Sequence, residues 1–254
     1  MIFDTHAHYD DEAFEPDRDE ILSQMKEAGI AYVVNIGANM ASSKRTVELS
    51  NQYPFVYGAV GVHPSDSEEI NEESLNQLRE WSKEEKIVAI GEIGLDYYWP
   101  EPSRDIQKKA LEAQVELAKE VKLPIVIHSR DAARDTADLL SCLHAGDCGG
   151  VIHCFSYTKE MARDFLNMGF HIGIGGVVTF KNAKKLKEAV AYIPMDRIVL
   201  ETDCPYLAPT PYRGKRNSSL YLPYVAEEIA KIKGVSYDEV LAATVANAKK
   251  MYRI

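Results

Sequence analysis

The sequence predicts an α/β protein folded as a TIM (β/α)8 barrel with an extra C-terminal helical segment. Two observations lead to this prediction. Eight short apolar runs alternate with segments of helical periodicity, which is the pattern of a parallel sheet with crossover helices. Several runs, such as IVAI at 87–90 and RIVL at 197–200, are continuous in apolar residues, as strands buried on both faces are.

The predicted strands follow one another along the whole chain. They cover residues 1–6, 31–37, 55–63, 87–94, 124–129, 150–156, 171–176 and 197–203. Amphipathic segments that we expect to be helical include 18–29, 74–85, 105–121 and 159–169. Gly29 and Gly169 each end such a segment directly before a strand, as glycines at helix C-termini do. Residues 236–254 predict a further helix or helix pair packed on the outside of the barrel.

No flexible linker or abrupt change of composition divides the chain, so we expect residues 1–254 to form one domain. An open, doubly wound sheet is the alternative fold. Its nucleotide-binding fingerprint is incomplete in GIGGVV at 173–178, and no G-x-x-x-x-G-K-[ST] loop is present. The sequence therefore gives no support to a nucleotide cofactor.

Composition limits the compartment and the partners. The formal net charge of -10 argues against broad electrostatic attraction to nucleic acid, although bound cations can reverse the field inside one cleft. No apolar stretch approaches the roughly 20 residues that span a bilayer, and no signal peptide is recognisable. The four cysteines form no C-x-x-C pair, so we expect reduced thiols. We expect a soluble, cytoplasmic protein with neither a membrane nor an obligate protein partner.

Histidines and carboxylates occupy the carboxyl ends of the predicted strands. They are His6, His8, His63, Glu92, His128, His153, Glu201 and Asp203. In a (β/α)8 barrel all these ends open onto one mouth, where active sites are built. Imidazoles and carboxylates suit Mg, Mn, Co or Zn, and this set offers more donors than one tetrahedral ion needs. We therefore predict two divalent metal ions, with Glu92 bridging them.

Simpler roles compete for some histidines. A lone histidine is more often a hydrogen-bonded structural residue than a metal ligand, and we expect this of His144, in a predicted helix, and of His171, at the start of a predicted strand. His6 and His8 differ, because residues two apart on an extended strand point to the same face. His63 either contacts substrate or only braces the mouth.

Basic side chains that could hold a phosphate are few. The segment PTPYRGKRNSS, after the eighth predicted strand, contains Arg213, Lys215 and Arg216, with Tyr206 and Tyr212 nearby. Basic groups neutralise phosphates and aromatic rings stack on unpaired bases, but a solvated loop is an equal alternative. Arg130 is a second candidate.

Six ordered motifs resemble those of the TatD family of metal-dependent deoxyribonucleases, within the amidohydrolase-like superfamily of TIM barrels. They are FDTHAH, GVHP, GEIGLDYY, PIVIHSRDA, HCFS and LETDCPYLAP, and the terminal VANAKKMY is similar to the family's closing element. The resemblance implies a two-metal site in which Glu92 is the bridge. It assigns the first ion to His6, His8 and Asp203, and the second to His128 and His153.

The resemblance also implies hydrolysis of DNA by an exonuclease that acts on ends or single strands, since a barrel mouth accepts a frayed strand more readily than a duplex. Asp203 and Glu92 are the expected catalytic residues, with Asp203 taking the proton from a metal-activated water. The expected substrate contacts are His63, Arg130, Glu201 and Arg213. Two other functions stay open: an ester hydrolase such as a D-aminoacyl-tRNA deacylase, and a non-catalytic metal-binding scaffold.

Overall fold

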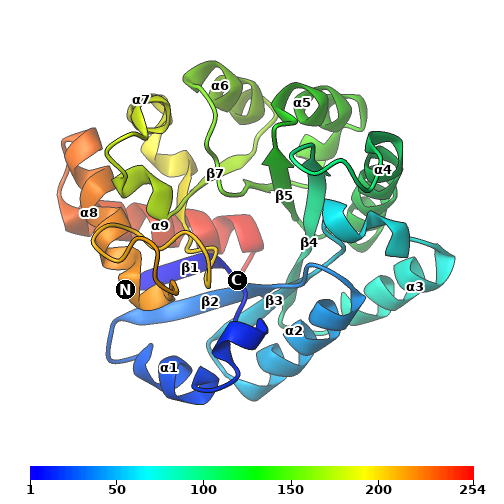
Figure 1. Ribbon diagram of the computed structural model, residues 1–254, viewed down its shortest axis with the longest axis horizontal. Helices are drawn as coiled ribbons and strands as arrows, with labels where there is room; N and C mark the ends of the chain where they lie inside the picture. Colours follow the sequence, from blue (N-terminus) through cyan, green and yellow to red (C-terminus); the bar gives the residue numbers. More distant parts are fainter.

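The computed structural model describes residues 1–254 as a barrel of parallel strands surrounded by helices (Figure 1). The strands are β1 (Ile2–Ala7), β2 (Ile30–Ile36), β3 (Val56–Val60), β4 (Ile87–Asp96), β5 (Ile125–Arg130), β6 (Gly150–Ile152), β7 (His171–Ile174) and β8 (Ile198–Leu200). Each pairs in parallel with the next along the chain. A bridge between Ala7 and Cys204 joins the end of β1 to the segment after β8. The predicted TIM barrel is confirmed.

An α-helix follows each strand, and all the helices but the last cover the outside of the barrel. They are α1 (Arg18–Gln24), α2 (Met40–Gln52), α3 (Glu72–Trp81), α4 (Arg104–Val121), α5 (Ala133–Cys142), α6 (Lys159–Asn167), α7 (Lys184–Tyr192), α8 (Leu222–Lys233) and α9 (Tyr237–Tyr252). Helices α2, α3 and α9 begin with capping boxes at Asn39, Asn71 and Ser236, whose side chains accept from otherwise free backbone N–H groups. None of the helices combines the length and apolarity needed to cross a lipid bilayer.

The C-terminal helix α9 closes one end of the barrel, whereas the sequence predicted that it packs on the outside. Its residues Ala248, Met251 and Tyr252 share a buried cluster with side chains from seven of the eight strands. The Tyr252 ring stacks on Phe3, and its hydroxyl donates to the carbonyl oxygen of Thr5 at 2.8 Å. Phe3 lies near the start of β1, so α9 covers the amino ends of the strands and passes behind them in Figure 1. The carboxyl ends are left open.

Candidate metal centre

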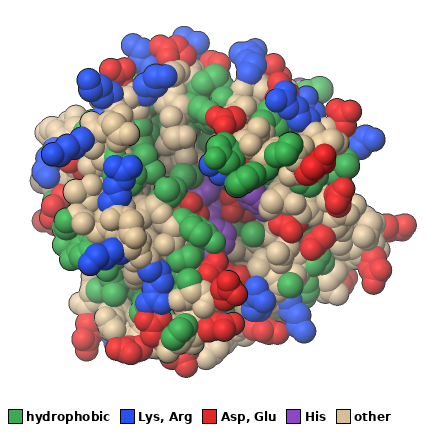
Figure 2. Space-filling model, viewed as in Figure 1, with side chains coloured by type: hydrophobic (Ala, Val, Ile, Leu, Met, Phe, Trp, Pro, Cys, Tyr) green, Lys and Arg blue, Asp and Glu red, His purple; other side chains and the backbone are tan.

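The carboxyl ends of the strands surround a cavity of about 1090 Å³. Figure 2 shows histidine side chains at the base of this hollow, with acidic side chains along one side. Five of the predicted metal ligands line the cavity: His8, Glu92, His128, His153 and Asp203. The sixth, His6, is fully buried beside them. The structure thus brings together all six residues, which come from positions 6 to 203 of the chain.

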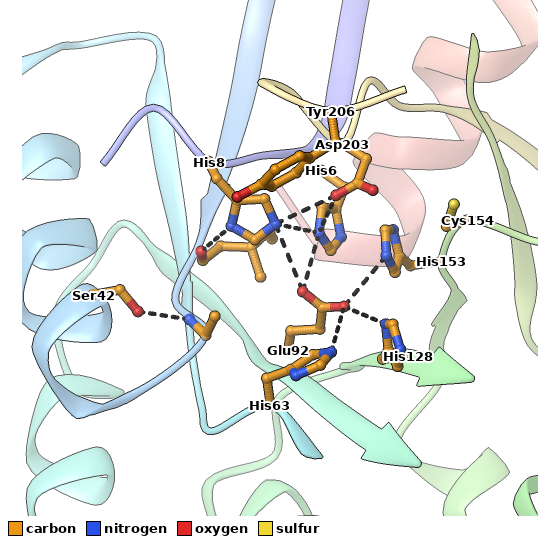
Figure 3. Close-up of polar contacts among 12 residues, drawn as sticks. His6, His8, Ser42, His63, Glu92, His128, His153, Cys154, Asp203 and Tyr206 are labelled. Atoms are coloured by element: carbon orange, nitrogen blue, oxygen red, sulfur yellow. Dashed lines mark hydrogen bonds and ion pairs between the residues drawn. The ribbon is translucent and has the colours of Figure 1, made fainter. Parts of the chain in front are cut away.

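One group of donors forms around an oxygen of Glu92 (Figure 3). Nε2 of His6 and Nε2 of His8 lie 3.4 and 3.6 Å from Glu92 Oε2, and 3.1 Å from each other. Asp203 Oδ1 lies 3.8 Å from Nε2 of His6 and 3.5 Å from Nε2 of His8. The Nε2 atoms of His6, in β1, and of His8, just after it, therefore each lie within 3.8 Å of an oxygen of Glu92 and an oxygen of Asp203.

A second group forms around the other oxygen of the same carboxylate. Glu92 Oε1 lies 2.8 Å from Nδ1 of His128 and 3.3 Å from Nε2 of His153. Nε2 of His63 lies farther away, at 3.9 Å. Glu92 thus presents one oxygen to each of two histidine groups, and its bridging of two ions stays a prediction.

These spacings fit divalent cations. With ligands about 2.1 Å from a tetrahedral ion, neighbouring ligand atoms lie about 3.4 Å apart. The distances of 3.1 to 3.8 Å among His6, His8, Glu92 and Asp203 span this value. The second group offers two imidazole nitrogens and a carboxylate oxygen. Both sets have the nitrogen and oxygen chemistry that Mg, Mn, Co and Zn accept.

Outer contacts hold two of the imidazoles in the orientation that a metal ligand needs. Nδ1 of His8 lies 2.8 Å from the carbonyl oxygen of Ile36, so Nδ1 carries the proton and Nε2 keeps its lone pair. Nε2 of His128 lies 3.2 Å from Asp96 Oδ2. Sequence reasoning missed Asp96, although its place four residues after Glu92 at the end of β4 was a signal.

The local electrostatics favour a cation among these groups. Burial acts to raise the pKa of Glu92, but the charges of His153 and His6 hold it well below its usual range. Burial acts to lower the pKa of His8, but Asp203 and Glu92 raise it to about 9. The anionic carboxylates thus favour positive charge among these groups, which either a protonated imidazole or a divalent ion can supply. For His63, burial and the charge of His128 lower the pKa to about 3, so this ring is neutral.

The other expected site residues lie in different places. His63 and Arg130 line the cavity, and the Arg130 guanidinium lies 3.8 Å from the centre of the Tyr98 ring. Arg213 lies over Phe180 and does not line the cavity. Glu201 is fully buried behind His153. Burial keeps Glu201 from contacting a substrate, whereas the expected contact of the exposed Arg213 stays a prediction.

The rim of the cavity is aromatic on some sides and acidic on another. Trp99 and Tyr206 line it with exposed fractions of 57% and 55%. The acidic side comes from the segment after β1 and consists of Asp10, Asp11, Glu12 and Glu15. Exposed aromatic rings beside a polar cavity can stack on planar groups. Trp99 was not predicted, and only its position after the motif GEIGLDYY pointed to it.

Comparison with known proteins places this site in a family. The family described as "TatD related DNase" matches residues 3–253. A protein of Bacillus subtilis named "Uncharacterized metal-dependent hydrolase YabD" is 46% identical over 254 residues, with both chains fully covered. The "3'-5' ssDNA/RNA exonuclease TatD" of Salmonella typhimurium is 31% identical over 258 residues, covering 100% of this chain and 99% of that protein.

A solved structure of a TatD homologue supports the same family assignment. The crystal structure of the TatD homologue YJJV from Escherichia coli K12 superposes with a TM-score of 0.94 at 29% identity, over 100% of this chain and 98% of that one. The similarity of fold and of sequence therefore extends over nearly the whole chain. This chain belongs to the TatD family of metal-dependent hydrolases.

Proposed function

We propose that this protein is a two-metal nuclease that hydrolyses the phosphodiesters of DNA from a single-stranded or frayed end. The observation that carries the proposal is the position of Glu92, which presents an oxygen to each of two histidine groups at the base of an open cavity. The family description and the name of the Salmonella relative support a nuclease.

Six residues would hold the two ions. They are His6, His8 and Asp203 for the first, His128 and His153 for the second, and Glu92 for both. Divalent ions bound there supply Lewis acidity and lower the pKa of water from 15.7 towards about 7. Asp203, whose side chain is 17% exposed at the base of the cavity, accepts the proton from the attacking water.

His63 binds the phosphate by donating a hydrogen bond. Its Nδ1 accepts from the backbone N–H of Ser65 at 3.1 Å, so in the neutral ring the proton is on Nε2. This Nε2 lies 3.9 Å from Glu92 at the second histidine group, where it reaches a phosphoryl oxygen. A neutral donor there stabilises negative charge on the phosphate without repelling a nearby cation.

The rim supports entry of a strand end and opposes passage of a continuous strand. Arg130 neutralises a backbone phosphate, and Trp99 stacks on an unpaired base. On the acidic side, Asp11, Glu12 and Glu15 repel further phosphates. A strand that enters over Arg130 therefore ends inside the cavity.

The test uses the purified protein with Mg, Mn, Co or Zn and labelled single- and double-stranded DNA. A single-stranded RNA and an aminoacyl-tRNA are included as competing substrates, and a His128→Ala protein excludes contaminating nucleases. We expect metal-dependent release of nucleotides from single-stranded DNA that the variant lacks. Release of an amino acid alone would favour an ester hydrolase, and inactivity on every substrate with both metals bound would overturn the nuclease.

A further inference from the structure

Three buried polar atoms behind the metal centre have no hydrogen-bond partner within the protein. They are Nδ1 of His6, Nδ1 of His153 and Oε2 of Glu201. The three side chains are at most 2% exposed, and one donor atom from each lies within 4.8 Å of the other two. The two imidazoles stack with their centroids 3.6 Å apart. An unpaired buried polar atom costs about 1–3 kcal/mol, so such a cluster requires an explanation.

Metal binding by the two histidines determines where their protons lie. Nε2 of His6 and Nε2 of His153 face Glu92, at 3.4 and 3.3 Å. A neutral imidazole that binds a cation through Nε2 carries its proton on Nδ1. Both Nδ1–H groups then need an acceptor, and metal-binding histidines usually find one in a carboxylate or a carbonyl oxygen. Nδ1 of His153 already lies 3.5 Å from Glu201 Oε1.

The surrounding backbone is built to admit the Glu201 carboxylate. A Cβ atom on Gly173 would lie 2.2 Å from Glu201 Oε2, which is closer than atoms can approach. The backbone N–H of Cys154 donates to Glu201 Oε1 at 2.5 Å and fixes the carboxylate. Glycine on β7 and this hydrogen bond from the segment after β6 therefore hold Glu201 next to His6 and His153.

We infer that Glu201 is a positioning residue shared by the two metal positions. It accepts hydrogen bonds from Nδ1–H of His6, a ligand of the first ion, and from Nδ1–H of His153, a ligand of the second. One carboxylate thus orients a ligand of each ion and links the two positions behind Glu92. The inference rests on the proposed two-metal site, but it needs no particular substrate.

The test is a calorimetric titration of metal-free protein with Mn²⁺ or Zn²⁺. Glu201→Gln keeps the shape of the side chain but removes its charge and one acceptor, and we expect both binding events to weaken about 10–100-fold. Asp96→Asn is the matched control, because His128 is the one predicted metal ligand that the Asp96 side chain contacts, so its loss is expected to weaken one event alone. Thermal unfolding of the metal-free variants reports any purely structural loss. If Glu201→Gln and Asp96→Asn lose the same metal affinity at the same binding events, Glu201 has no special link to the two metal positions.

Other outcomes are equally informative. Unchanged affinities in Glu201→Gln, or loss at one event only, would overturn the shared role. If this variant fails to unfold cooperatively, Glu201→Asp, which retains the charge on a shorter side chain, is titrated in its place, and weaker binding at both events is again expected. If the wild-type protein binds two ions but cleaves no nucleic acid, the proposed nuclease activity is wrong and the inferred role of Glu201 is unaffected.

Discussion

Nε2 of His128 lies 3.2 Å from Oδ2 of Asp96, while Nδ1 of the same ring lies 2.8 Å from Glu92. The imidazole is therefore held between an inner carboxylate, shared by both donor groups, and an outer one. Asp96 is fixed in turn, because its Oδ1 accepts from the backbone N–H of Tyr98 at 2.9 Å. This chain of contacts places the proton of His128 on Nε2 and directs the lone pair of Nδ1 toward Glu92, where we propose that the second ion binds.

Replacing Asp96 by Asn tests this arrangement. The amide keeps the volume of the side chain but removes the charge that makes His128 a stronger ligand. We expect one of two metal-binding events to weaken about 10–100-fold, with the other unchanged, in a calorimetric titration with Mn²⁺. Weakening of both events, or of neither, would contradict the assignment of Asp96 to His128 alone.

Asp203→Asn tests proton transfer. Loss of a general base lowers kcat by about 10²–10⁴-fold. We expect a loss of this size at saturating metal, with KM for a single-stranded oligonucleotide little changed, because Asp203 acts on the attacking water and not on the bound strand. Steady-state kinetics measures both constants, and metal content measured beforehand shows whether the variant still binds its ions. An equal loss of turnover and of substrate affinity would argue against the role as base.

Trp99→Ala tests the aromatic rim. Stacking of a base on an aromatic side chain contributes about 1–3 kcal/mol, so we expect KM for single-stranded DNA to rise roughly tenfold while kcat changes little. Trp99→Phe, which keeps a ring, is the matched variant and retains most of the affinity. If both variants bind the strand like the wild type, bases do not stack at Trp99.

The sequence predicted the barrel and its donor set because both follow from simple periodicities. In a barrel of parallel strands every carboxyl end lies at the same mouth, so the proximity of residues as distant in sequence as His6 and Asp203 could be predicted. The position of α9 could not be predicted in this way. An apolar helical face fits the outside of a barrel as well as its end, and only the contacts of Tyr252 with Phe3 and Thr5 distinguish the two.

The direction in which an individual side chain points could not be predicted from the sequence either. Glu201 ends a strand as Asp203 does, yet the glycine at 173 opens space behind the ligands and Glu201 fills it. Arg213 follows β8 toward the mouth, but its guanidinium packs on Phe180. Such choices depend on the shape of neighbouring elements, which strand and helix periodicity does not encode.

His171, at the start of β7, gives a prediction for acid stability that does not involve the metal ligands. His171 is 7% exposed, and the pKa of its ring is lowered to about 4, chiefly by burial. The charges of Arg197 and Lys250 also lower the pKa, whereas the charge of Asp196 acts to raise it. An unfolded chain protonates histidine near pH 6.5. Above pH 6.5, His171 is neutral in the folded and in the unfolded protein, so it adds no pH dependence to stability. Between pH 6.5 and 4, the unfolded protein binds a proton at His171 that the folded protein does not, so the folded state loses stability as the pH falls.

The loss reaches up to about 3 kcal/mol below pH 4. We expect His171→Gln, which cannot take up the proton, to lose less stability than the wild type between pH 7 and 4.5 in urea unfolding of metal-free protein. The control is His144→Asn, because His144 is exposed and its left-handed backbone suits Asn. The metal ligands titrate equally in all three proteins, so the difference between the curves isolates His171. If the wild-type and His171→Gln curves run parallel, protonation of this ring is not what destabilises the fold in acid.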